Sequence, residues 1–483
     1  MPEIYLPPEI WRYVVQSICL HCSRDGSNPT TPQDRHRHAA ASSRALLNLC
    51  LTSTMLNRLA TPCLYHVPIT KKVLALFQKL LDNPDLARHV RELHNDTCSG
   101  WPSWDYSNRD RQYAMQRHHP ENQGTLTSRS RYPPAFLELY DSLRQHTPEI
   151  HDHDRPTEPG DQTLSACGPG AMWIEDHQRD TTLVSLLPNL TTFSVVVRWC
   201  RICIGHLRLP PGFLSKLTSA SFVSKDDHDV SRTWDLRRLP ELAPNLTSLH
   251  LVYFGGEINS STELFVFPNV THLSMEHARF SGSSLTDFID SFPRLERLDF
   301  HQHYLYYPAP DIIMDLSLSR QRFGLRSLSI DCFDANSGRI RPWTSLGHYL
   351  SDMENLEVLK VDQTCICIPE PDIPEATSPE TPPWERKPDN MGSINMNELP
   401  SWIKALHIFC YWWPSQDKLW QAVLSFARAA PQRFPALKNV VLEFEGTCRV
   451  DAQLQRTWEK ADVWEEVGIR LTCTELPTRP ILG

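Results

Sequence analysis

The stretch that decides the fold reads APNLTSLHLVYF and runs from Ala243 to Phe254. Two later stretches keep its apolar positions while the polar letters change. They are FPNVTHLSMEHARF, from Phe267 to Phe280, and FPRLERLDFHQH, from Phe292 to His303. A fixed apolar frame with drifting polar positions indicates one supersecondary unit that is copied several times along the chain.

The frame places apolar residues at a first position and at three and five residues beyond it. Nine copies follow this rule, most of them separated by intervals near the period of about 20 to 29 residues that is typical of leucine-rich repeats. The triplets are Leu190, Phe193, Val195; Leu217, Ala220, Phe222; Leu246, Leu249, Leu251; Val270, Leu273, Met275; Leu295, Leu298, Phe300; Leu325, Leu328, Ile330; Leu356, Leu359, Val361; Ile403, Leu406, Ile408; and Leu437, Val440, Leu442.

This spacing predicts a parallel β-sheet with one buried and one open face. The residues three and five beyond the first position lie two apart and point to the same side of a short strand. The residues two, four and six beyond it point to the other side. Helix-like stretches lie between strands at 283–291, 344–353 and 416–430, with apolar residues three and four apart. Since no single copy can bury its apolar face alone, we expect an α/β leucine-rich-repeat solenoid with outer helices and a long concave surface. The alternative is an ordinary α/β domain whose strands look alike.

Composition bounds the class of protein. The 483 residues are 40% hydrophobic, enough for a large core, and the net charge of -9 gives no general attraction to nucleic acid or to anionic lipid. The start, MPEIYLPPEIW, has no signal-peptide pattern, and no later stretch holds about 18 apolar residues in a row. Fourteen cysteines are far fewer than a disulfide-stapled secreted scaffold of this length carries. We therefore expect reduced thiols, a cytoplasmic or nuclear location, and neither nucleic acid nor membrane as partner.

The first 66 residues form a different kind of module. LPPEIW opens a helix, because proline suits the first helical position and an early acid suits the helix dipole. Ile10, Val14 and Ile18 recur every four residues, and a polar loop follows over Ser23–His38. A second, leucine-rich helical stretch then runs until Pro62 ends it. We expect a small all-α module over 3–66, with connecting helices and the start of the repeat array over 67–97.

LPPEIW together with ALLNLCLTSTMLNRLATPCLYH, from Ala45 to His66, resembles the F-box of fungal F-box proteins with C-terminal leucine-rich repeats. LARHVRELH, over 86–94, is similar to the segment that begins the repeat array in those proteins. The chain departs from the family pattern in a longer loop between the helices and in a leucine-rich end that replaces a common tryptophan.

In that family the F-box docks on a Skp-type adaptor, which joins a cullin scaffold that brings ubiquitin-transfer machinery to whatever the repeats hold. The resemblance implies a substrate-recognition subunit of a Skp-cullin-F-box (SCF) E3 ubiquitin ligase, which is not itself an enzyme and needs no cofactor, with an unknown target protein. The residues that match the adaptor-binding positions are Leu6, Pro7, Glu9, Ile10, Val14, Leu49, Leu51, Leu56 and Leu59.

Other interpretations stay open. Some of these apolar residues must pack against one another inside so small a module. The protein could bind the adaptor as a scaffold with no role in ubiquitination, or it could be a plain leucine-rich-repeat interaction protein whose helices only cap the array.

Two segments are too polar to bury a core. We expect a disordered insertion over 98–170, with a short helix near Pro134–Gln145, and a disordered acidic, proline-rich loop over 369–397 within a repeat array that spans 171–475.

The sequence offers no catalytic motif and no convincing metal site. Two Cys-x-x-Cys pairs, Cys19 with Cys22 and Cys200 with Cys203, lie too far apart to form one zinc site, so we interpret them as structural cysteines. The run His151–Asp154 has no distant partner that the sequence identifies. No phosphate-binding glycine loop or nucleophile elbow occurs, and we expect no metal.

The open strand positions become charged midway along the array, and two aromatic runs follow strands directly. Since aromatic residues and arginine dominate interface energies, we expect a partner-binding surface there. Its candidates are His272, Arg297, Asp299, His301, Tyr304, Tyr306, Lys360, Tyr411, Trp412 and Trp413. The alternative is that the charges are merely solvated and the aromatics close the sheet edge.

Overall fold

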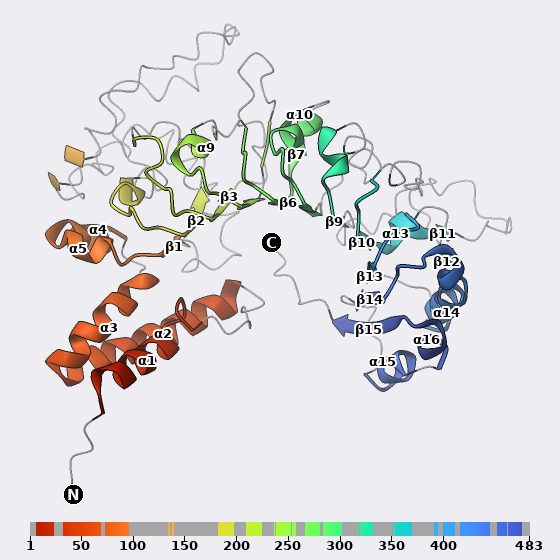
Figure 1. Cartoon of the computed structure of the whole chain (residues 1–483), viewed down its shortest axis with the longest axis horizontal. Coiled ribbons are helices and arrows are strands. Elements are labelled where there is room, and N and C mark those ends of the chain that lie inside the picture. Colours follow the sequence, from red (N-terminus) through yellow and green to blue (C-terminus); the bar gives the residue numbers. More distant parts are fainter. Residues whose placement is uncertain are drawn as a thin grey trace, which may run out of the picture. The chain divides into compact units, whose positions relative to one another are not determined.

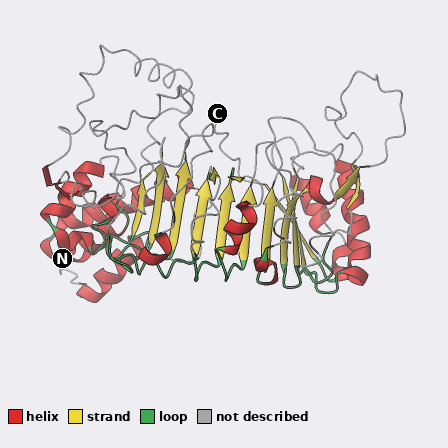
Figure 2. Ribbon diagram, turned by 90° about the horizontal axis from the view of Figure 1, so that it is seen from above, coloured by secondary structure: helices red, strands yellow, loops and turns green. Residues whose placement is uncertain are grey.

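A computed structural model describes a large part of the chain (Figures 1 and 2). The described residues are 6–23, 32–68, 73–95, 134–135, 138–139, 182–197, 209–224, 236, 238–252, 254–256, 266–280, 284–301, 316, 319–331, 350, 353–369, 391–394, 399–410, 416–444, 452–460 and 462–475. Among the described residues, no helix combines the length and the apolar character that crossing a membrane needs.

The chain begins with three helices, α1 (Pro8–Ile18), α2 (Pro32–Thr52) and α3 (Thr54–His66). As predicted, α1 starts with proline in its first turn and Glu9 directly after it. The three helices share a small core, around which Ile18, Leu49, Cys50, Leu59 and Leu64 pack partly buried. This core consists of Val15, Cys19, Leu46, Ala60 and Cys63.

Three predictions for this module were wrong. The expected loop over Ser23–His38 is helical from Pro32, and the leucine-rich stretch forms two helices that meet at Ser53. Ser53 caps α3, because its hydroxyl oxygen accepts from the backbone N–H of Leu56 at 3.2 Å. Pro62 does not end a helix but lies inside α3, which continues to His66. Proline removes one backbone hydrogen bond, and we attribute the helix's continuation to the burial of neighbouring Ala60 and Cys63 in the core.

A short connection leads from this module into the sheet. It comprises α4 (Val73–Asp82), α5 (Pro84–Ala87) and β1 (Glu92–Asn95). The backbone N–H of Arg91 donates to the carbonyl of His66 at 3.0 Å, which joins the end of α3 to the residue just before β1.

In all nine predicted triplets, the second and third apolar residues belong to one parallel sheet of eleven strands, and the first lies two residues before its strand (Figure 2). This confirms the α/β class and is consistent with a repeat architecture. Nine strands carry these residues: β2 (Thr192–Val197), β3 (Ser219–Ser224), β4 (Ser248–Val252), β6 (His272–Glu276), β8 (Arg297–His301), β9 (Ser327–Asp331), β10 (Val358–Asp362), β13 (Ala405–Cys410) and β14 (Asn439–Phe444). β1 precedes them, and β15 (Arg470–Glu475), which the triplet rule missed, follows them. Among the described residues, a first compact unit ends at Leu246 and a second begins at Thr247.

The register explains why the triplets recur. In the second unit Leu249 lies opposite Leu273, which in turn lies opposite Leu298. None of the triplet residues is more than 4% exposed. Each strand therefore adds its apolar side chains to the same layers as its neighbour, and the polar positions between them lie together on the other face.

Helices cover the apolar face between strands. Their bounds are α9 (Leu239–Leu242), α10 (Ser284–Asp290), the 3-10 helix η6 (Arg320–Phe323), α13 (Gln363–Ile366), α14 (Gln416–Arg433), α15 (Ala452–Glu459) and α16 (Asp462–Val467). The helices predicted at 283–291 and 416–430 are confirmed as α10 and α14, which lie on one side of the strands of the second unit in Figure 1. Of the third, predicted at 344–353, the structure describes only Leu350, which is helical, and Met353.

Two small pairings complete the described part. β5 (Gly255–Gly256) pairs in parallel with β7 (Arg279–Phe280), and β11 (Cys367–Pro369) pairs antiparallel with β12 (Met391–Ile394). β12 lies inside the segment 369–397 that we expected to be a disordered loop, so that expectation was wrong for these four residues. The predicted insertion over 98–170 falls outside the described residues, apart from 134–135 and 138–139, which are helical.

An asparagine before three of the triplets links each repeat to the previous one. The side-chain amide of Asn189 donates to the carbonyl of Arg88 at 2.8 Å, and that of Asn245 donates to Ser215 at 2.8 Å. The amide of Asn355 donates to the carbonyl of Phe323 at 2.6 Å. The recurrence of asparagine in the frame therefore has a structural cause.

Candidate functional site

The predicted adaptor-binding residues divide into three groups by burial. Pro7, Glu9, Ile10 and Leu51 are exposed, with Ile10 45% and Leu51 78% accessible. Leu56 is buried, at 7%. The remaining four are half-buried: Leu6, Val14, Leu49 and Leu59. Ile10 and Leu51 are therefore the large apolar members that are exposed to another protein, whereas Leu56 is buried.

Sequence reasoning missed two further exposed apolar residues in this module. Tyr13 on α1 is 72% exposed, and Leu47 on α2 is 48% exposed. Ile10 and Tyr13 are three residues apart, and Leu47 and Leu51 are four apart, so each pair shares one face of its helix. In the described part of the chain, four of the six large exposed hydrophobic residues lie on α1 and α2. Such a concentration of apolar side chains is typical of a protein-binding surface.

The predicted partner face brings together three of its residues at one carboxylate. His272 Nε2 lies 2.9 Å from Asp299 Oδ2, and Arg297 donates to the same oxygen from Nη2 at 2.8 Å and from Nε at 2.9 Å. Asp299 is almost fully buried. Burial by itself raises its pKa, but the hydrogen bonds from His272 and Arg297 outweigh this effect and hold the pKa at about 2.

Histidine–carboxylate pairs recur along the open face of the second unit. His250 Nε2 lies 3.2 Å from Glu276 Oε1, and His301 Nδ1 lies 3.6 Å from Asp331 Oδ2. Burial by itself raises the pKa of Glu276, but the hydrogen bond and the charge of His250 outweigh this effect and lower the pKa to about 2. A fourth pair joins His407 on β13 to Glu443 on β14, with Nδ1 and Oε1 3.1 Å apart.

Of the remaining predicted partner residues, the structure describes only Lys360. Lys360 is half-buried on β10, directly opposite His407 in the register. Tyr304, Tyr306, Tyr411, Trp412 and Trp413 lie outside the described residues. Sequence reasoning did not select His250, His407 or Glu443. The signal that could have found them is a histidine on one strand with an acid two positions further along the next strand.

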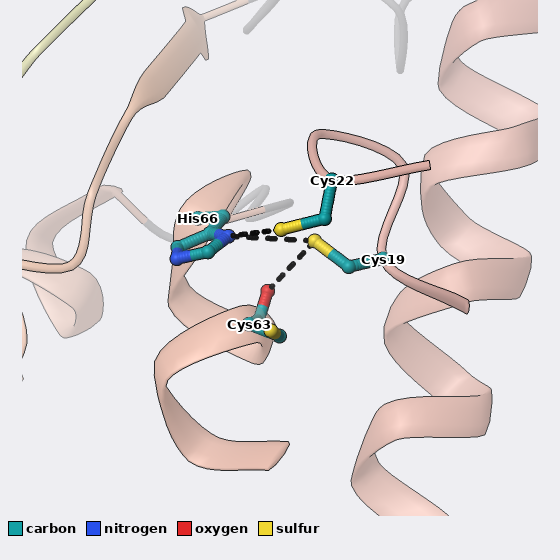
Figure 3. A group of neighbouring side chains, drawn as sticks. All are labelled: Cys19, Cys22, Cys63 and His66. Atoms are coloured by element: carbon teal, nitrogen blue, oxygen red, sulfur yellow. Dashed lines mark hydrogen bonds between the residues drawn. The ribbon is translucent and has the colours of Figure 1, made fainter. Parts of the chain in front are cut away.

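A cluster of cysteine and histidine side chains lies between the ends of α1 and α3 (Figure 3). It comprises Cys19, Cys22, Cys63 and His66, whose potential ligand atoms all lie within 4.8 Å of one another. His66 Nδ1 is 3.5 Å from Cys19 Sγ and 3.4 Å from Cys22 Sγ. Cys19 and Cys63 are buried, whereas Cys22 is exposed.

The three thiols influence one another strongly. The pKa of Cys19 falls well below its usual range, first because the Cys63 thiol hydrogen-bonds to it. Burial raises the pKa of Cys22, and the neighbouring Cys19 thiolate raises it further. Without a nearby cation, deprotonation of one thiol therefore disfavours deprotonation of the other two.

Sequence reasoning missed this cluster because it compared only Cys-x-x-Cys pairs with each other. The partner of Cys19 and Cys22 is the pair Cys63-Leu-Tyr-His66, a Cys-x-x-His spacing on the last turn of α3. Cys200 and Cys203, and the run His151–Asp154, lie outside the described residues.

No protein-family model matches the chain, and a search of the curated proteins found no match either. The class of the protein is therefore defined by its own structure. It is an α/β protein in which a parallel sheet of repeated strands follows a small helical module.

Proposed function

We propose that the protein is the substrate-recognition subunit of an SCF E3 ubiquitin ligase, in which α1–α3 form an F-box that binds a Skp-type adaptor and the leucine-rich repeats bind a target protein. The observation that carries this proposal is the set of four exposed apolar side chains on α1 and α2, in a module that opens with LPPEIW and precedes a repeat sheet. Through the adaptor a cullin joins the complex, in the cytoplasm or nucleus.

The adaptor-binding step depends on burying apolar surface. Ile10, Tyr13, Leu47 and Leu51 lose water contact on docking, and each Å² of apolar surface removed from water contributes roughly 25 cal/mol. Leu56, buried inside the module, acts indirectly by keeping the helices in place. The chain itself performs no chemistry in this scheme, because holding a target near the transfer machinery raises the rate by positioning alone.

The target-binding step belongs to the open face of the repeat strands. There His272, Arg297 and Asp299 hold one another in a fixed arrangement. Side chains that are already ordered lose little entropy when a partner binds, so this network offers a rigid polar surface. Tyr304, Tyr306 and the run Tyr411–Trp413 extend the proposed contact set.

The test is co-purification of the full chain with a Skp-type adaptor. We expect Ile10→Asp and Leu51→Asp each to weaken adaptor binding at least about fivefold, since interface anchors contribute roughly 1 kcal/mol or more. Matched controls are Val266→Asp and Phe323→Asp, which change residues that are 49% and 50% exposed outside the helical module. Circular dichroism checks that all four variants are folded.

Two results would overturn the proposal. If the wild-type chain does not bind the adaptor, or if the control variants weaken binding as much as Ile10→Asp and Leu51→Asp, the helical module is not an F-box. If the adaptor binds but no cullin co-purifies and no bound protein becomes ubiquitinated, the protein is an adaptor-binding scaffold without a role in ubiquitination.

A further inference from the structure

We propose that Cys19, Cys22, Cys63 and His66 bind one structural Zn²⁺ ion, which ties the end of α1 to the end of α3. The proposal rests on the side chains of this cluster and is independent of the proposed function.

The four potential ligand atoms lie nearly as close together as the corners of a zinc tetrahedron. With Zn–S bonds of about 2.3 Å and Zn–N bonds of about 2.0 Å, the edges of a zinc tetrahedron measure roughly 3.5 to 3.8 Å. The two distances from His66 Nδ1 to the sulfurs of Cys19 and Cys22 are 3.5 and 3.4 Å, and no pair of ligand atoms is more than 4.8 Å apart. Bringing all four into coordination therefore needs displacements of about 1 Å or less.

The chain delivers its ligands as two pairs on two helix ends. Cys19 caps α1, and the turn after it is closed by two backbone hydrogen bonds to the carbonyl of Cys19, from Cys22 at 3.0 Å and from Ser23 at 2.8 Å. This turn brings the sulfur of Cys22 back beside that of Cys19, as Figure 3 shows. Cys63 and His66 are three residues apart on α3 and so share one helix face. Two closely spaced pairs from separate elements are the usual arrangement of a structural zinc site.

The donor set selects the metal and the kind of site. Three soft thiolate sulfurs and one imidazole nitrogen suit zinc and not magnesium or calcium, which take oxygen ligands. Four protein ligands fill a tetrahedron and leave no open position, so the site is structural and not catalytic. Burial of cysteines in a core does not explain it, because Cys22 is exposed and its sulfur faces His66 all the same.

Neighbouring groups hold His66 in place. The ring of His21 meets that of His66 edge to face, with centroids 5.0 Å apart. The backbone carbonyl of His66 accepts from Arg91, the residue just before β1. A zinc ion at His66 would therefore also stabilise the junction between α3 and the first strand. The gain matters because the core cluster that the described residues of this module form is small, with five buried members, and small cores are marginally stable without a metal or a disulfide.

The experiment measures metal in the purified full-length chain. Mass spectrometry of the metal content should give one equivalent of zinc per chain, as purified or after dialysis against zinc. The variants Cys22→Ser, Cys63→Ser and His66→Ala should fall to near zero, while Cys50→Ser, which changes a cysteine of the same module outside the cluster, should keep one equivalent. Cobalt in place of zinc should give the visible absorption of a tetrahedral thiolate-ligated site.

A rescue variant separates loss of a ligand from loss of folding. His66→Cys replaces one zinc ligand by another and should retain one equivalent, whereas His66→Ala should not. Chelator should lower the melting temperature of the wild-type chain and of Cys50→Ser, but not that of Cys22→Ser. The proposal is overturned if the wild-type chain binds no zinc under either condition, if Cys22→Ser retains it, or if the native state carries a disulfide within the cluster.

Discussion

The carboxylate of Asp299 is buried and lies beside the side chains of an arginine and a histidine. Its Oδ2 contacts both His272 on the preceding strand and Arg297 on its own strand. The ordinary pKa of an aspartate is 3.8, and that of Asp299 is lowered to about 2. Since the folded pKa lies below the unfolded one, Asp299 stabilises the fold fully above pH 3.8, and this contribution is lost as the pH falls towards 2.

Replacing Asp299 by Asn should therefore remove a pH-dependent part of the stability. At pH 7 we expect the free energy of unfolding to fall by about 2 kcal/mol, because a lowering of nearly two pKa units corresponds to roughly that amount. At pH 2 the difference between wild type and variant should shrink markedly. Urea unfolding at the two pH values measures both differences, and an equal difference at both would contradict the assignment.

Asn355 should contribute to the stability of the second unit. Its side-chain amide donates to the carbonyl of Phe323 at 2.6 Å, so Asn355→Ala leaves that carbonyl to solvent. We expect a loss of about 1 kcal/mol, the usual net value of one hydrogen bond. Asn439→Ala, which changes an exposed residue on β14, is the control and should stay within about 0.5 kcal/mol of wild type. Thermal or urea unfolding measures the loss of stability in both variants. Equal losses in the two would reject the role given to Asn355.

At the scale of single elements, local rules predicted the start of α1 but not the end of α3. Proline and glutamate at the start of α1 act within one turn, and their effect is visible in the sequence. Pro62 acts against a helix locally, yet α3 continues past it because Cys63 and Ala60 are buried against α1 and α2. Burial decided the end of this helix, and burial is a property of the assembled module.

The helical module offers a direct comparison between a packing residue and a surface residue. Leu56→Ala should lower the stability of the module by about 2 to 4 kcal/mol, because Leu56 is buried and its truncation leaves a cavity. Leu51→Ala should change stability by less than about 0.5 kcal/mol, since Leu51 is 78% exposed, and should weaken adaptor binding. Unfolding and binding measured on the same two variants distinguish the roles. Equal destabilisation by both would show that Leu51 is not free for a partner.

The cysteine–histidine cluster and the charged network also depend on contacts that a single helix or strand does not reveal. Each half of the cluster can be recognised in the sequence, Cys19 and Cys22 as Cys-x-x-Cys and Cys63 and His66 as Cys-x-x-His. Only the packing of α1 against α3 brings the two halves together. His272 and Asp299 were selected from the sequence as separate charges. Their contact depends on the register of β6 against β8, which follows from the alignment of the buried leucines.

At the scale of the whole molecule, a repeat architecture couples each unit chiefly to its neighbours. Leu359 on β10 lies opposite Leu328 on β9 and Leu406 on β13 in the buried layer. In such arrays stability is approximately a sum of unit terms and nearest-neighbour terms. A defect in one strand should therefore be felt first by the strands beside it.

Leu359→Ala tests this coupling. We expect a loss of about 2 to 5 kcal/mol, with reduced hydrogen-exchange protection in β9, β10 and β13 and little change in α1–α3. Lys360→Ala, one residue away on the open face, is the control and should leave protection nearly unchanged. A uniform loss of protection over the described strands and helices would show that the chain unfolds as one cooperative unit instead.

The sequence alone determined that this chain forms a parallel sheet of repeated strands, because the same apolar triplet recurs along the chain and leaves each copy with a face that only its neighbours can bury. It also determined where α1 begins and which face of each strand is buried. The tertiary structure decided which leucines of the proposed adaptor site are exposed, which acid each histidine meets, and that Cys19 and Cys22 lie beside Cys63 and His66. These outcomes depend on contacts between residues far apart in the chain, and no local pattern specifies which helix ends or strand positions will meet.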